Sequence, residues 1–197
     1  MGPGLMTGRH LVVVDVESTG LDPARHVPVE VAAINMTTGE ELRFVPRVAA
    51  DALVGMPVAP EALRINGYYE RGLWADPITY ADTVDAYRLL WNMLDGNTFG
   101  GCNPSFDAGM LIAGYRHASL CHVNFSNDAP PVWHHRLADI STMTAGHLDL
   151  PPTDLPGLDR CCELLGVTNE APHTAMGDAR ATAACFQALA DRQGPAA

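Results

Sequence analysis

The chain contains no lysine and no apolar run long enough to cross a bilayer. All twelve basic residues are arginine, and 23 acidic residues bring the formal net charge to −11. Such acidity argues against tight, nonspecific binding to long nucleic acid, which needs a basic face, but it leaves room for a small site where metal ions neutralise phosphates. Residues 1–9 carry no apolar segment followed by a cleavage site, so we expect a cytoplasmic protein without membrane contact.

The chain also has few cysteines, and their number and spacing indicate no paired arrangement. The five cysteines are odd in number and contain no Cys-x-x-Cys pair, so the sequence indicates neither a disulfide framework nor a zinc site. With 197 residues, 47% hydrophobic and 18% charged, the chain suits one globular domain. We expect this single domain to span residues 10–192, with frayed ends at 1–9 and 193–197.

The order of expected elements is strands first, then alternating helices and strands, which predicts an α/β fold with a mixed central sheet flanked by helices. A helix over 82–94 has Asp82 as a candidate N-cap. The stretches 49–80 and 121–135 are rich in turn formers and are expected to be irregular, apart from short helical pieces such as 60–65. The expected strands are 12–16, 30–35, 41–48, 98–101 and 137–140. The other expected helices are 106–117, 158–165 and 178–192.

The first strand carries the most informative pattern. Valines at 12, 13, 14 and 16 indicate a buried strand, and Asp15 and Glu17 stand two residues apart on it. Because side chains alternate along a strand, both carboxylates project on the same side. Their mutual repulsion, made worse by burial, favours a hard divalent cation such as Mg²⁺ or Mn²⁺ between them.

Three further residues are ambiguous when taken singly. Asp107 opens a predicted helix, where it either complements the helix dipole or binds a ligand. Asp178 lies near the start of the last helix and is compatible with simple capping. His173 follows Pro172, so we expect it in a loop. A lone histidine is more often structural or solvated than catalytic, although its neutral form can accept a proton from water.

Taken together, these residues resemble the motifs of the DnaQ-like 3′–5′ exonucleases of the DEDDh group. Cys102 departs from the pattern, since the family often has histidine there. The first motif is matched by Asp15, Glu17, Thr19, Gly20 and Leu21, the second by Asn103, Phe106 and Asp107, and the third by His173, Ala175, Asp178 and Ala179. Ile65-Asn66-Gly67 also resembles a segment common between the first two motifs.

The resemblance implies a ribonuclease H-like fold and hydrolysis of phosphodiester bonds at 3′ ends with two divalent ions, Mg²⁺ or Mn²⁺, releasing nucleoside 5′-monophosphates. The residues implied as catalytic are Asp15, Glu17, Asp107, His173 and Asp178. Those implied as metal ligands are Asp15, Glu17, Asp107 and Asp178. Those implied as substrate-binding are Ser18, Thr19, Gly20, Leu21, Asn103 and Phe106. For Phe106, stacking on a terminal base and packing in the core stay open as alternatives.

The expected partners are 3′ ends of single-stranded DNA or RNA, together with a polymerase or replication partner and a second copy in a homodimer. DNA is slightly favoured, in a proofreading or repair role. The alternatives are an exoribonuclease acting on RNA ends or short oligoribonucleotides, and a non-catalytic nucleic-acid-binding module with the same fold.

Overall fold

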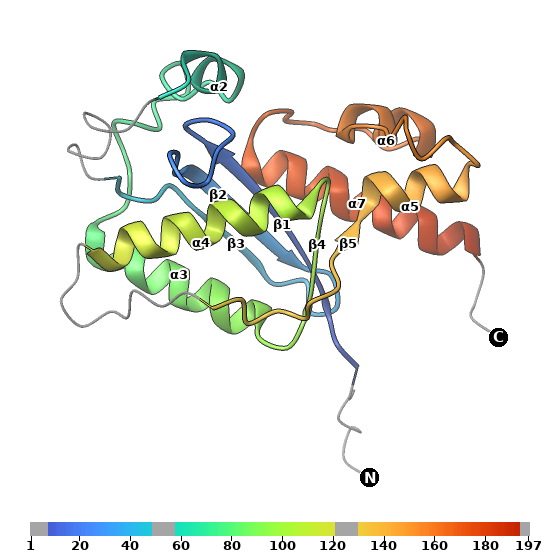
Figure 1. Ribbon diagram of the computed structural model, residues 1–197, viewed down its shortest axis with the longest axis horizontal. Coiled ribbons are helices and arrows are strands. Elements are labelled where there is room, and N and C mark those ends of the chain that lie inside the picture. Colours follow the sequence, from blue (N-terminus) through green and yellow to red (C-terminus); the bar gives the residue numbers. More distant parts are fainter. Residues whose placement is uncertain (1–7, 49–57, 121–129, 194–197) are drawn as a thin grey trace, which may run out of the picture.

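A computed structural model describes residues 8–48, 58–120 and 130–193. The predicted frayed ends lie largely outside these residues, as do residues 49–57 and 121–129 of the two segments predicted to be irregular. Figure 1 shows the described part as one sheet with helices packed on both sides.

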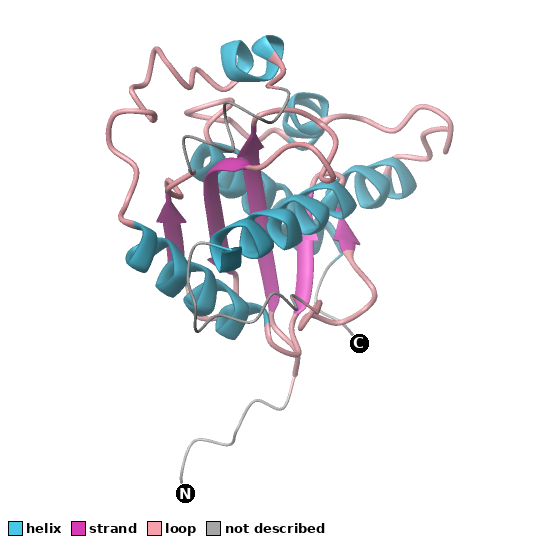
Figure 2. Cartoon of the chain, turned by 60° about the vertical axis from the view of Figure 1, so that its left-hand side comes forward, coloured by secondary structure: helices cyan, strands magenta, loops and turns pink. Residues whose placement is uncertain are grey.

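Five strands form this sheet in the order β3-β2-β1-β4-β5. β1 pairs antiparallel with β2 and parallel with β4; β2 and β3 are antiparallel, and β4 and β5 are parallel. The mixed sheet flanked by helices (Figure 2) confirms the predicted fold class. The strands are β1 (Leu11–Ser18), β2 (Pro28–Asn35), β3 (Glu41–Phe44), β4 (Thr98–Gly101) and β5 (Ala138–Asp139).

The two faces of the central strand β1 pack against different helices. Val12, Val14 and Val16 belong to the cluster of apolar side chains that packs with α3 and α4. Val13 faces the opposite cluster, which includes side chains of α6 and α7. Because side chains alternate, Asp15 and Glu17 follow Val13 toward α7. The described helices are α2 (Pro60–Ile65), α3 (Tyr80–Leu94), α4 (Pro104–Leu120), α5 (Ile140–His147), α6 (Leu158–Leu165) and α7 (Ala175–Gln193).

Several predicted boundaries need correction. Asp82 does not cap α3: Thr79 is the N-cap, and its hydroxyl oxygen accepts the N–H of Asp82. β3 ends at Phe44 instead of residue 48, because Pro46 cannot donate to a neighbouring strand. α4 begins at Pro104, where a proline suits the first helical turn, and α7 begins at Ala175, one turn earlier than expected.

The helix α5 was not predicted. Its sequence, Ile-Ser-Thr-Met-Thr-Ala-Gly-His, contains β-branched residues and a glycine, all poor helix formers. Asp139 caps it by accepting the N–H of Ser141 at 3.0 Å, and Ile140 and Ala145 are buried. Capping and packing therefore override a weak local preference. Within the described residues, no helix combines the length and apolar character needed to span a membrane.

Candidate active site

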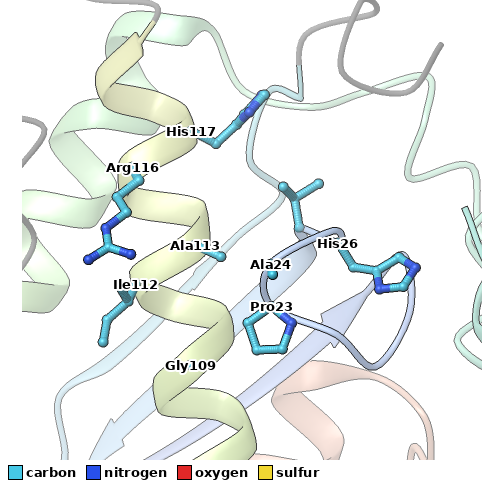
Figure 3. Close-up of a pocket in the computed structure, with 9 residues that line it drawn as sticks. Pro23, Ala24, His26, Gly109, Ile112, Ala113, Arg116 and His117 are labelled. Atoms are coloured by element: carbon cyan, nitrogen blue, oxygen red, sulfur yellow. The ribbon is translucent and has the colours of Figure 1, made fainter. Parts of the chain in front are cut away.

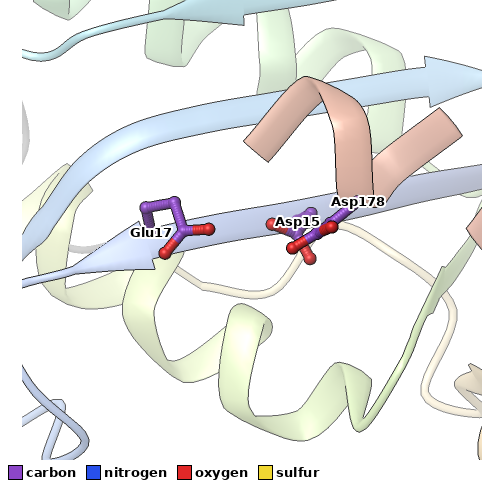
Figure 4. Close-up of side chains that lie close together, drawn as sticks. All are labelled: Asp15, Glu17 and Asp178. Atoms are coloured by element: carbon purple, nitrogen blue, oxygen red, sulfur yellow. The ribbon is translucent and has the colours of Figure 1, made fainter. Parts of the chain in front are cut away.

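Three carboxylates converge between the first strand and the last helix. Asp15 and Glu17 reach from β1, and Asp178 reaches from the first turns of α7 (Figure 4). One carboxylate oxygen of each lies within 4.8 Å of the other two. We call Asp15, Glu17 and Asp178 the carboxylate group. Residues 15 and 178 are thus brought together by the packing of α7 on β1, which no local pattern specifies.

Asp107 lies outside this group and faces the edge of β1. Its Oδ1 accepts the backbone N–H of Val16 at 2.9 Å, and the residue is 4% exposed. β1 pairs with β4 from Leu11 to Val13, so Asp107 provides the acceptor that the shorter strand β4 does not provide at Val16. The second carboxylate oxygen of Asp107 is not used by this bond.

Burial and mutual repulsion raise the pKa values of these acids. Burial, followed by repulsion from Asp107, Asp178 and Glu17, raises the pKa of Asp15 well above its usual range. Burial raises the pKa of Asp107 to about 8, although the Val16 hydrogen bond opposes the shift. The protonated forms of all four acids, Asp15, Glu17, Asp107 and Asp178, are therefore favoured. The site lacks the positive charge that would stabilise their carboxylates.

Glu17 and Asp178 have additional partners. Burial, then repulsion from Asp178 and Glu30, raises the pKa of Glu17 to about 7, while Arg71 and a hydrogen bond from Asn66 act in the other direction. Burial also raises the pKa of Asp178, opposed by the hydrogen bond from Asn169 and by His173.

His173 stands at the entrance to α7, beside Asp178. Its side chain is exposed, and its backbone has a φ of +59°, which is uncommon for a residue other than glycine. The His173 N–H donates to Oδ2 of Asp178 at 3.2 Å, and Asn169 donates to Oδ1 at 2.6 Å. The loop and the carboxylate are therefore tied together.

In the turn after β1, two polar side chains are buried and one apolar side chain is exposed. Ser18 and Thr19 are buried: the Ser18 hydroxyl donates to the carbonyl of Gly20 at 2.7 Å, and Thr19 Oγ1 accepts the N–H of Val27 at 3.1 Å. Leu21 is 80% exposed. The two hydroxyls hold the turn, and Leu21 is the side chain presented to the surroundings.

Gly20 is needed for the close packing of this turn. A Cβ added there would come within 2.5 Å of the His26 ring. His26 is itself fixed, because its Nδ1 accepts the N–H of Asp22 at 3.0 Å.

Asn103 and Phe106 lie at the start of α4, before Asp107. Asn103 has a φ of +59°; its N–H donates to Asp139, and its carbonyl accepts the N–H of Phe106. The side chain of Phe106 is half-buried against the core. Both residues help to set the beginning of α4, and neither belongs to the carboxylate group.

Sequence reasoning missed an ion pair next to the carboxylate group. Glu30 lies directly opposite Glu17 in the β1–β2 register and is fully buried. Its carboxylate pairs with Arg71 at 2.7 Å. The detectable signal was a glutamate at the head of an apolar strand, since an acid is almost never fully buried without a partner. The side-chain amide of Asn66, in the Ile-Asn-Gly segment noted above, donates to the carbonyl of Ser18 at 3.1 Å.

A cavity of about 500 Å³ lies between the turn after β1 and α4 (Figure 3). Among the described residues that line it, His26, Arg116 and His117 carry nitrogen-bearing side chains and none carries a carboxylate. None of the site residues expected from the sequence lines it. The cavity is therefore distinct from the carboxylate group.

The mixed five-stranded sheet flanked by helices is a ribonuclease H-like fold. The family model described as Exonuclease, RNase_T, matches residues 12–186. The chain belongs to this DnaQ-like exonuclease family, as its three motifs predicted, and the prediction of an exonuclease is confirmed.

Similar proteins include a ribonuclease T and a PolC-type DNA polymerase. Ribonuclease T of Shigella boydii is 27% identical over 203 residues, which cover 94% of this chain and 86% of the relative. The PolC-type DNA polymerase III of Bacillus cereus is 26% identical over 179 residues, covering 90% of this chain. The chain spans only 11% of that polymerase's length.

Solved structures show the same fold. E. coli exonuclease I in complex with a dT13 oligonucleotide superposes with a TM-score of 0.69 at 22% identity, covering 94% of this chain and 42% of exonuclease I. The exonuclease I of Methylocaldum szegediense superposes with a TM-score of 0.67 at 21% identity, covering 95% of this chain and 41% of that protein.

Proposed function

We propose that this protein removes nucleotides from the 3′ end of single-stranded nucleic acid by metal-dependent hydrolysis, releasing nucleoside 5′-monophosphates. The observation that carries the proposal is the carboxylate group, whose three oxygens lie within 4.8 Å of one another. The family supplies the exonuclease activity. Our proposal adds the 3′–5′ direction of hydrolysis, the use of two metal ions and the roles of the individual residues.

The donor set fits divalent cations. Carboxylate oxygens are the ligands that Mg²⁺ and Mn²⁺ prefer, and raised pKa values at Asp15, Glu17 and Asp107 indicate a site that lacks compensating positive charge. Asp15, Glu17 and Asp178 would hold one ion, and Asp15 and Asp107 would hold a second. Two such ions, when bound, would activate a water and neutralise charge on the phosphate and the leaving oxygen.

The remaining chemistry falls to His173. Its imidazole is exposed, belongs to the loop that leads into α7, and is tied through its backbone to Asp178. In the neutral form, an imidazole nitrogen of His173 would take the proton of the attacking water.

Apolar contacts would hold the terminal nucleotide. Leu21 is 80% exposed and Ile65 is 46% exposed. The segments that carry them touch, because Asn66 donates to the Ser18 carbonyl and the N–H of Ala59 donates to the Thr19 carbonyl. These side chains offer an apolar surface to a base without reading its identity. Asn103 and Phe106 are proposed to border the same nucleotide from α4.

The nature of the sugar gives two candidate substrates. DNA is slightly favoured, and exonuclease I, which has the same fold, was crystallised with a DNA oligonucleotide. The match to ribonuclease T over 86% of its length favours the alternative, an exoribonuclease acting on RNA ends. The match to a PolC-type polymerase supports the predicted polymerase partner, whereas the predicted homodimer and cytoplasmic location stay predictions.

The experiment uses matched DNA and RNA oligonucleotides labelled at the 5′ end, incubated with Mn²⁺ or Mg²⁺. A ladder that shortens from the 3′ end is expected, and comparison of the two rates selects the substrate. Asp15→Ala should abolish the ladder, while the exposed control Asp154→Asn should not. Absence of shortening with either polymer and either ion would refute the proposal and favour a non-catalytic binding module.

His173→Ala separates the base from the metal ligands. It should lower the rate by roughly 100-fold or more, as expected for loss of a general base, with divalent-ion binding retained in a calorimetric titration. Equal loss of rate and ion binding would assign His173 a structural role.

A further inference from the structure

The loop that carries His173 is held through three backbone groups, two on His173 and one on Ala175. The His173 N–H donates to Asp178 at 3.2 Å, the His173 carbonyl accepts from Arg71 Nη1 at 3.3 Å, and the Ala175 N–H donates to Glu30 Oε2 at 3.2 Å. His173 also has the unfavourable φ of +59°, a conformation that persists only where surrounding contacts enforce it. Two of these contacts come from Arg71 and Glu30.

Glu30 anchors the arrangement from inside the sheet. It is fully buried on β2, where an unpaired carboxylate would be strongly destabilising. Arg71 Nη2 donates to both of its oxygens, at 2.8 and 2.7 Å, and Arg43 Nε donates to Oε1 at 2.7 Å. The side chain of Arg71 is only 26% exposed, so the pair has little freedom to reorient.

The second amino group of Arg71 points away from Glu30. Its Nη1 donates to the carbonyl of Asn66 at 3.0 Å and to that of His173. Asn66 in turn donates to the carbonyl of Ser18, at the start of the turn after β1. One planar guanidinium therefore joins the buried carboxylate, the His173 loop and the segment that supports the Ser18–Leu21 turn.

We propose that the Arg71–Glu30 pair is a positioning device for catalysis that fixes the His173 loop over the carboxylate group. The inference rests on the proposed function, in which His173 accepts the proton of the attacking water. Small displacements of a catalytic group lower rates steeply, so a loop held by a rigid, buried ion pair favours turnover without either residue touching substrate.

The alternative is that Arg71 merely compensates the buried charge of Glu30. Lysine distinguishes the two roles, because its ammonium keeps the charge but lacks the planar fork that serves Glu30 and two carbonyls at once. Arg43→Lys is the matched control: within the described part of the chain, Arg43 contacts the same Glu30 oxygen as Arg71 but makes no hydrogen bond to the His173 loop.

The decisive measurement is kcat and KM for 3′-end hydrolysis by Arg71→Lys, Arg43→Lys, His173→Ala and the double variant Arg71→Lys/His173→Ala. Arg71→Lys should lower kcat by roughly tenfold or more while KM and Mn²⁺ affinity change by less than about twofold. Arg43→Lys should keep the parental kcat. The double variant should be no slower than His173→Ala, because the positioned group is already gone.

Parental kcat in Arg71→Lys would overturn the proposal, as would a double variant whose loss is the product of the two single losses. If the parent itself hydrolyses no oligonucleotide, the proposed function fails, and amide hydrogen exchange then judges the positioning separately. Faster exchange at His173 and Ala175 in Arg71→Lys, but not in Arg43→Lys, would support the device. Unchanged exchange in Arg71→Lys would overturn it.

Discussion

Asp107 accepts the backbone N–H of Val16, the residue between Asp15 and Glu17, at 2.9 Å. The bond joins the first turn of α4 to the edge of β1, and it sets the distance between the acid of the second motif and the two acids of the first. One oxygen of Asp107 thus holds the start of α4 against β1.

Replacements of Asp107 should separate its hydrogen bond to Val16 from its proposed role as a metal ligand. Asp107→Asn keeps an acceptor for Val16 and removes the charge, so we expect a thermal midpoint at or above the parental value and a loss of activity of about 100-fold or more. Asp107→Ala also leaves the buried N–H of Val16 unsatisfied, which should lower the free energy of unfolding by about 1–3 kcal/mol. Asp82→Asn is the control, because Asp82 lies at the start of α3, where its carboxylate accepts the hydroxyl of Thr79 at 2.7 Å. An Asp107→Asn protein of parental activity would remove Asp107 from the site.

Stability should depend on pH in the direction opposite to that of an ordinary salt-bridged acid. The folded pKa values of Glu17 and Asp107, about 7 and about 8, lie above their usual values. The folded state therefore binds more protons than the unfolded state between about pH 4 and pH 8. In EDTA, the thermal midpoint should fall as pH rises through this window.

Addition of Mn²⁺ at pH 8 should restore the midpoint, because the ion supplies the missing charge. The same pair of measurements on Asp15→Asn should give a smaller effect in both directions. A midpoint in EDTA that rises from pH 5 to pH 8 would contradict the described electrostatics.

Gly177 precedes Asp178 and has no space for a side chain. A Cβ there would lie 2.0 Å from the backbone carbonyl oxygen of Ala171, which cannot move without shifting the His173 loop. Gly177→Ala should therefore lower both activity and the thermal midpoint. Gly146→Ala in α5 is the matched control: its Cβ would meet nothing within 4 Å, so it should stabilise by about 0.5–1 kcal/mol. A Gly177→Ala protein as stable and active as the parent would contradict the close packing here.

Leu21 should matter for substrate and little for stability. Because it is 80% exposed, Leu21→Ala should leave the thermal midpoint unchanged and raise KM for a single-stranded oligonucleotide, by roughly the factor of ten that loss of one base contact implies. Leu89→Ala on α3 removes another exposed leucine, 59% exposed, and should change neither quantity. Equal KM values for Leu21→Ala and the parent would remove Leu21 from the proposed substrate surface.

The sequence by itself determined the strand-and-helix order and the strand that carries the first two acids. Alternation along β1 was sufficient to place Asp15 and Glu17 on one face, because the period of a strand is a local property. The helices expected over 82–94 and 158–165 correspond to α3 and α6, and α6 ends at Gly166, whose φ of +75° makes a left-handed cap. The motifs supplied the family, since their order along the chain is itself a sequence property.

Only the tertiary structure decided which acids meet. Asp178 joins Asp15 and Glu17 because α7 packs on the same face of β1, whereas Asp107 approaches the strand edge from α4. The helix α5 and the Glu30–Arg71 pair escaped prediction for the same physical reason. Burial, caps and ion pairs between residues far apart in the chain, such as 30 and 71, outweigh local propensity, and their energies exist only once the chain has folded.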